Sequence, residues 1–163
     1  MRNFQAFPID GAALLESLGS VGLYGFSCNR RDFGTHVSVY TVWLCLGDGT
    51  VLRLQPEMHD LEGWDEVGSL KIDQVESSDA VPSLVRLGSQ WQDIASVEKL
   101  VVGEPDYFSA ESGLKITNRE QEAIIICNSA APYELALSTP ATRDAFNPEY
   151  PLERYSVCPL FLE

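Results

Sequence analysis

Acidic side chains crowd one stretch of this 163-residue sequence, and their types and spacing are the ones that could do chemistry. Between Glu57 and Asp79 there are eight acidic residues and one base, Lys71. In the first part of the stretch, five carboxylates alternate with apolar residues and one imidazole; they are Glu57, Asp60, Glu62, Asp65 and Glu66, interleaved with Met58, His59, Leu61 and Trp64. A patch of this kind attracts a cation or a basic partner.

A metal ion is the first cation to consider. His59, Glu62 and Asp65 are spaced three apart, which would put them near one face of a helix, and oxygen ligands with one imidazole could hold a divalent ion. Gly63 weakens a helix here, and the regular alternation of acids found in calcium-binding loops is absent. The sequence therefore favours a solvated acidic loop, and we predict neither a metal site nor another cofactor.

A basic protein is the second kind of partner, and Trp64 makes it the leading hypothesis. Carboxylates steer a lysine- or arginine-rich surface toward contact, while an aromatic ring supplies an anchor that loses its water on binding. We predict a non-enzymatic interaction protein whose partner-binding residues are Glu57, Asp60, Glu62, Trp64, Asp65 and Glu66. Small acidic inhibitors of basic enzymes, such as bacterial immunity proteins, offer an analogy in size and charge alone, because no family motif matches.

Two other functions stay open at this stage. A small-ligand-binding domain would use an aromatic-lined cleft of a sheet near Trp43, Trp91 or Tyr107. An enzyme would need a nucleophile or base, yet there is no Gly-x-Ser-x-Gly motif and no Cys-x-x-Cys pair, so no catalytic residue is predicted. The four cysteines have apolar neighbours and are expected to be buried reduced thiols; they are Cys28, Cys45, Cys127 and Cys158.

Composition limits the partners. A net charge of −13 repels phosphate groups, so we expect neither nucleic acid nor an anionic membrane as a partner. The content of 45% hydrophobic and 21% charged residues is typical of a globular protein, and no signal-peptide pattern is present at the start, so a cytoplasmic location is predicted. The acidic stretch could also serve only solubility, or protect an exposed strand edge from pairing.

The elements expected to position the acidic stretch are mostly strands. Residues 37–44 are mostly β-branched or aromatic, and Gly47-Asp48-Gly49 supplies a turn before the returning strand 50–54. Residues 67–75 predict a half-buried edge strand directly after the acidic run. A second hairpin is expected from 114–117 and 123–127, with further strands at 97–102 and 133–137.

Helices are expected to be few. Asp10 could cap a short helix through Leu18 that Gly19 ends, and residues 82–93 favour one further helix over an irregular segment. The apolar C-terminal segment from Arg143 is expected to pack back over the sheet or to form a homodimer contact. The predicted fold is therefore a single α+β domain over residues 1–163, with a mainly antiparallel sheet built from at least two hairpins.

Overall fold

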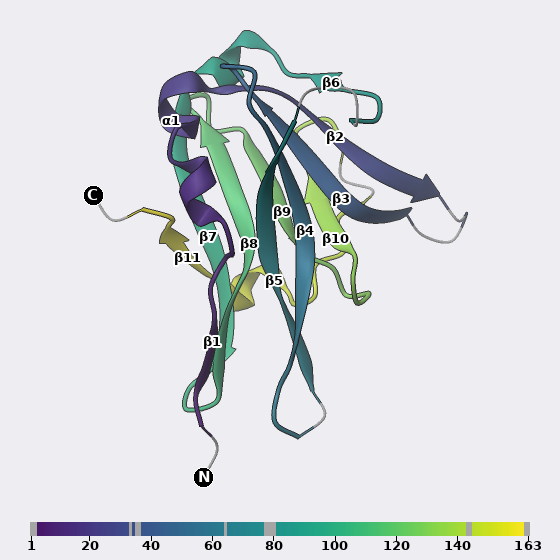
Figure 1. The fold of residues 1–163 in the computed structure, drawn as a ribbon, viewed down its shortest axis with the longest axis vertical. Coiled ribbons are helices and arrows are strands. Elements are labelled where there is room, and N and C mark those ends of the chain that lie inside the picture. Colours follow the sequence, from purple (N-terminus) through teal and green to yellow (C-terminus); the bar gives the residue numbers. More distant parts are fainter. Residues whose placement is uncertain are drawn as a thin grey trace.

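The computed structural model describes residues 3–32, 34, 37–63, 65–76, 81–142 and 145–161, and two β-sheets dominate them (Figure 1). The first sheet has the order β5-β4-β3-β2-β6 and is formed by β2 (Leu23–Asp32), β3 (Val37–Leu46), β4 (Val51–Asp60), β5 (Glu66–Val75) and β6 (Val85–Arg86). The second has the order β10-β9-β8-β7-β11, with β1 beside β8, and is formed by β1 (Gln5–Phe7), β7 (Ile94–Glu104), β8 (Phe108–Asn118), β9 (Ala123–Asn128), β10 (Leu135–Ser138) and β11 (Ser156–Pro159).

Both predicted hairpins are confirmed. In the first, Val42 of β3 lies opposite Leu54 of β4, and Gly49 adopts a φ of 89°, which only glycine tolerates easily. The Asp48 carboxylate accepts a hydrogen bond from the Thr50 N–H at 3.0 Å and holds this turn. In the second, β8 pairs with β9 from Gly113 to Thr117. Alternating apolar residues thus give antiparallel ladders in both places.

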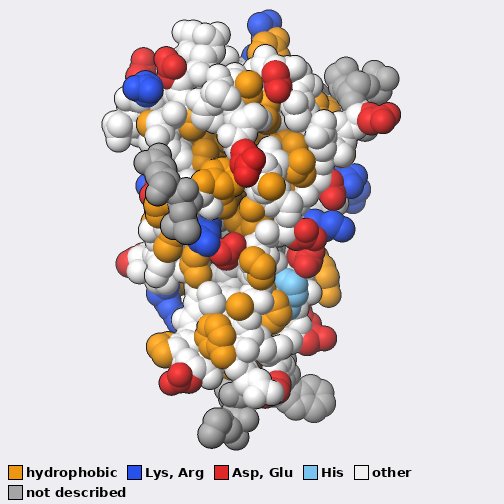
Figure 2. Space-filling view, turned by 60° about the vertical axis from the view of Figure 1, so that its left-hand side comes forward, with side chains coloured by type: hydrophobic (Ala, Val, Ile, Leu, Met, Phe, Trp, Pro, Cys, Tyr) orange, Lys and Arg blue, Asp and Glu red, His pale blue; other side chains and the backbone are white. Residues whose placement is uncertain are grey.

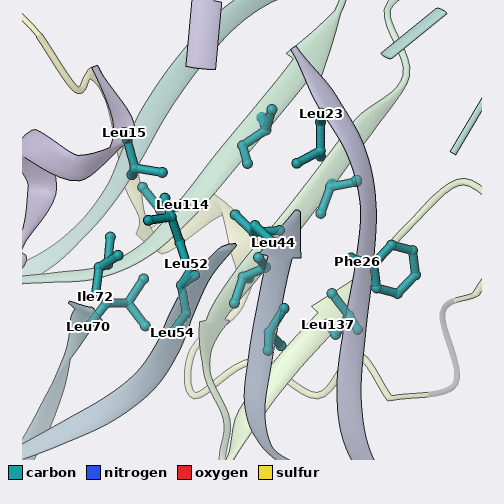
Figure 3. Packing of buried hydrophobic residues seen from close by; sticks show 14 of the residues in the cluster. Leu15, Leu23, Phe26, Leu44, Leu52, Leu54, Leu70, Ile72, Leu114 and Leu137 are labelled. Atoms are coloured by element: carbon teal, nitrogen blue, oxygen red, sulfur yellow. The ribbon is translucent and has the colours of Figure 1, made fainter. Parts of the chain in front are cut away.

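The hydrophobic core lies between the two sheets. Leu44, Leu52 and Leu54 of the first sheet are fully buried, as is Leu114 of the second, and their side chains point toward one another (Figure 3). Burying each of these leucines is worth about 1.5–3 kcal/mol. Burial of apolar side chains between the two sheets is therefore the main contribution to the stability of the fold.

Helical structure is short, and the prediction of its limits was wrong. The first helical stretch consists of a 3-10 turn, Ala12–Leu15, followed by α1 (Leu18–Val21), so Gly19 lies inside the helix rather than after it. Asp10 does not cap it, because its backbone is bonded to β5. In the segment 82–93 the structure has β6 and a 3-10 turn, Ser89–Gln92, in place of the expected helix. This short turn is enough to place the Trp91 side chain in the core. The domain remains in the α+β class, weighted strongly to strands.

The N-terminal segment links the two sheets. β1 runs parallel to β8, and Ile9 N–H donates to the Glu111 carboxylate at 3.0 Å. At Asp10 the chain crosses to β5, where the Asp10 N–H donates to the Leu70 carbonyl at 2.9 Å and its carbonyl accepts from Ile72 at 2.7 Å. The prediction that β5 is an edge strand is confirmed, but this crossing already occupies part of its edge.

The C-terminal segment packs back on the second sheet. β11 pairs with β7, and Tyr155 just before it is 6% exposed. A 3-10 turn, Leu152–Arg154, leads into this strand. Within the described parts of the chain, no helix is long and apolar enough to cross a membrane.

Candidate functional site

The predicted partner-binding residues lie at the tip of the hairpin formed by β4 and β5. Glu57 and Asp60 belong to the end of β4, Glu66 begins β5, and Glu62 and Asp65 lie in the turn between them. The turn is closed by a hydrogen bond from the Leu61 N–H to the Asp65 carbonyl at 2.7 Å. Apart from half-buried Glu57, these carboxylates are exposed. The hairpin therefore displays these charges to solvent, and among the described residues no lysine or arginine forms an ion pair with them.

Trp64, the expected aromatic anchor, lies outside the described residues. Its role in the site stays a prediction from the sequence. The part of the tip that is described consists of the carboxylates and of Leu61, which is 6% exposed and packs in a cluster with Val67 and Tyr107.

His59 does not join Glu62 and Asp65 on a helical face, because this segment is a strand and a turn. Its ring stacks on Phe7 of β1, with the ring centroids 4.2 Å apart, and its Nε2 lies 2.8 Å from the Ser69 Oγ. The Glu57 carboxylate is 3.7 Å from the same nitrogen. No group of three His, Cys, Asp or Glu side chains among the described residues is arranged to hold a metal ion.

Tyr107 extends the acidic surface to a second hairpin. It lies in the turn between β7 and β8, and its hydroxyl donates to the Glu62 carbonyl at 2.8 Å, with the Asp65 carboxylate 3.4 Å away. Glu104 at the end of β7 and Asp106 in this turn are both exposed. Two hairpins that are more than 40 residues apart in the chain thus present carboxylates side by side.

We call this surface the acidic end; it is formed by Asp60, Glu62, Asp65, Glu66, Glu104 and Asp106. Figure 1 shows the two hairpins at the lower end of the molecule, and red acidic side chains lie there in Figure 2. Neither turn contains a lysine or arginine. Glu104 and Asp106 were missed from the sequence because only the contact of Tyr107 with Glu62 brings them to the others.

The cysteine thiols give little support to nucleophilic chemistry. Cys127 is fully buried, and desolvation, with a smaller contribution from the Glu149 charge, raises the pKa of its thiol to about 12. Burial also raises the pKa of Cys45. Both thiols therefore stay protonated at neutral pH. The prediction of a buried thiol is confirmed for Cys127 and was wrong for Cys28, Cys45 and Cys158, which are half-buried.

Half-buried Glu149 forms a second polar feature that the sequence does not reveal. Desolvation raises the pKa of its carboxyl from the ordinary 4.5 to about 7, and its Oε2 is buried with no hydrogen-bond partner. Burial, the nearby Cys127 and the Glu149 charge also raise the pKa of Tyr155. The C-terminal segment therefore holds a carboxyl that prefers to be neutral.

The aromatic side chains expected to line a ligand cleft are largely used for packing. Trp91 is 1% exposed and Tyr107 is 7% exposed, and Trp43 is half-buried on β3. A groove of about 450 Å³ opens elsewhere, between the N-terminal helical turns, β7 and the C-terminus, and is lined mainly by aliphatic residues and Phe161. Trp91 and Tyr107 are thus used in packing, and a ligand cleft beside these aromatics stays a prediction from the sequence.

Comparison with known proteins places the chain in no group: no family model, no curated protein and no solved structure matches it. The function must therefore be inferred from the site itself.

Proposed function

We propose that this protein is a non-enzymatic interaction protein whose acidic end binds a basic segment of a protein partner. The observation that carries the proposal is the meeting of two hairpins through Tyr107, which gathers exposed carboxylates from both without a lysine or arginine in either turn. Charge concentrated in this way raises the rate at which an oppositely charged surface associates.

Protection of an edge strand is the competing explanation for these charges. Asp10 bonds the outer edge of β5 at Leu70 and Ile72, so part of this edge needs no charged side chains to keep other chains away. Glu104 is the last residue of β7, beyond the part of that strand that β11 covers, whereas Asp106 lies in the turn, where there is no strand edge to protect. Edge protection therefore does not account for every carboxylate of the acidic end, and partner binding does.

A homodimer through the C-terminal segment is a further part of the proposal. Most apolar residues of that segment pack inward, while Val157 of β11 is 47% exposed and Leu152 is 43% exposed. A dimer would use these two residues, and light scattering of the wild type and of Val157→Lys would detect it by a difference in mass.

The experiment for the acidic end compares two variants with the same net charge. The first carries Glu62→Gln, Asp65→Asn and Glu66→Gln. The control carries Glu16→Gln, Glu76→Gln and Glu120→Gln, which remove three exposed carboxylates away from the acidic end. Each protein is used to capture partners from an extract of the source cells at low and at moderate salt.

We expect the wild type and the control to enrich the same basic proteins, and the acidic-end variant to lose them. With a purified partner, the acidic-end variant should associate more slowly and show a flatter salt dependence, while Trp64→Ala should dissociate faster. Equal loss in both triple variants would mean that overall charge, and not this end, drives binding, and the proposal would then be rejected.

A further inference from the structure

The first sheet splits between β3 and β4 at a proline. The two strands pair only where Val42–Cys45 faces Val51–Leu54, although both continue beyond, and Figure 1 shows them diverging. In this register Thr41 would next face Gln55, and the next hydrogen-bonded pair would be Tyr40 and Pro56, where proline has no N–H to donate. The Tyr40 N–H instead donates to the Asn29 Oδ1 at 2.9 Å. The Thr41 N–H donates to the same oxygen at 2.7 Å, at an irregularity of β2 between Cys28 and Arg30. The missing donor of Pro56 and these bonds to Asn29 together account for the end of the ladder.

Beyond this point one edge of β4 faces the split. The Leu70 carbonyl and the Ile72 N–H are bonded to Asp10, on the side of β5 away from β4. In an antiparallel pair, alternate residues direct both backbone groups to the same side, so Leu70 and its opposite residue Pro56 face away from each other. Pro56, and Met58 two residues on, therefore direct their backbone groups into the split.

A hollow of about 450 Å³ lies at this split. Its lining consists of Tyr40, Thr41, Gln55, Pro56, Glu57, Met58, Lys71 and Tyr133. The Met58 N–H and carbonyl face it with no strand opposite them in the described chain. Tyr133, 62% exposed and held at a φ of 66°, presents its ring at the rim. An open strand edge beside a hollow can accept an extended peptide as an added strand.

The charges along this edge change from one end to the other. Glu57 lines the hollow, and Asp60 and Glu62 follow it toward the tip of the hairpin. Lys71 lies opposite Gln55, five residues before Asp60, which is about 17 Å along the strand. A complementary segment therefore carries its positive charges in the half that runs toward the acidic end.

We propose that the edge of β4 from Pro56 to Asp60 accepts an extended, basic segment of the partner as an additional strand. This inference rests on the proposed function and names how the partner binds. Backbone hydrogen bonds at Met58 supply affinity, and the carboxylates of the acidic end select lysine and arginine in the adjoining half of the segment.

The probe for this proposal is a heptapeptide of alternating lysine and valine, labelled for fluorescence anisotropy. Its counterpart is N-methylated at every internal residue, which keeps the side chains and charges but removes the N–H donors. We expect the N-methylated peptide to bind the wild type about tenfold more weakly or worse, because at least one to two backbone hydrogen bonds are lost. Met58→Pro should weaken the unmodified peptide similarly, while Met58→Leu should not.

The result separates this proposal from the proposed function. If both peptides bind equally and both are weakened by the triple acidic-end variant, the acidic end binds basic segments but not by strand addition, and the present inference is overturned. If the triple acidic-end variant binds the unmodified peptide as tightly as the wild type does, the acidic end does not select basic segments, and the proposed function is rejected together with this inference. Self-association that Met58→Pro abolishes would assign the edge to a second copy and also overturn the inference. Should Met58→Pro not fold, the peptide pair on the wild type still decides.

Discussion

Substituting Glu149 should change how stability depends on pH. Its pKa is raised from 4.5 to about 7 by burial, so between these values the folded protein holds a proton that the unfolded chain has lost. The stability that this proton provides is fully present below pH 4.5 and is lost as the pH rises through 7. The free energy of unfolding should therefore decrease across this window because of Glu149.

The magnitude follows from the same pKa. A rise from 4.5 to about 7 corresponds to at most about 3 kcal/mol, and since the carboxyl is only half-buried, solvent screening reduces this to about 1–2 kcal/mol. Glu149→Gln stays neutral at every pH. At pH 8 the variant should therefore be more stable than the wild type by about 1–2 kcal/mol relative to their difference at pH 4.5.

Urea unfolding followed by tryptophan fluorescence measures this directly, because Trp91 is buried in the folded state. Curves recorded at pH 4.5, 6, 7 and 8 give the difference in unfolding free energy between the variant and the wild type. Glu153→Gln, an exposed glutamate in the same segment, is the matched control and should give a constant difference. A difference for Glu149→Gln that is also constant over this range would refute the reasoning from burial.

Two further changes test the packing. Gly68→Ala should cost about 2–3 kcal/mol in a thermal or urea melt, because the added methyl would displace the Asn128 side chain from its hydrogen bonds to two backbone carbonyls. Gly19→Ala, with no atom in the way, should be neutral or stabilising by up to about 1 kcal/mol, and an equal loss in both would contradict this. Alkylation at pH 8 read by mass spectrometry should modify half-buried Cys158 before Cys127; early modification of Cys127 would show that its thiol is not buried.

The local signals in the sequence were sufficient for the hairpins. Gly47-Asp48-Gly49 between two alternating strands predicts one hairpin, and the apolar run 123–127 after a polar turn predicts the other, since both depend on contacts close in the chain. The short helix was placed only roughly, because Asp10 has stronger backbone bonds available on β5 than a cap would offer. The pairing of Asp10 with β5, a contact distant in the sequence, therefore determined where the helical turns begin.

The candidate site was also predictable only where it depends on residues close together in the chain. The acidic run and its place beside an edge strand follow from the sequence, but the addition of Glu104 depends on the Tyr107 hydroxyl reaching Glu62, which no local pattern encodes. Pro56 is the sequence signal for the open edge of β4. A proline inside a strand indicates that one of its edges is unpaired.

The crossing of the N-terminal segment between the two sheets has a consequence for the order of folding. Ile9 bonds Glu111, 102 residues further along the chain. During synthesis at about 5–20 residues per second, the first strand waits on the order of 5–20 seconds for β8 to appear. Such a high separation between partners slows the search for the native pairing. The segment that emerges first therefore cannot complete its pairing until β8 has been made, and until then the edge of β5 at Leu70 and Ile72 can lack the cover that Asp10 gives it.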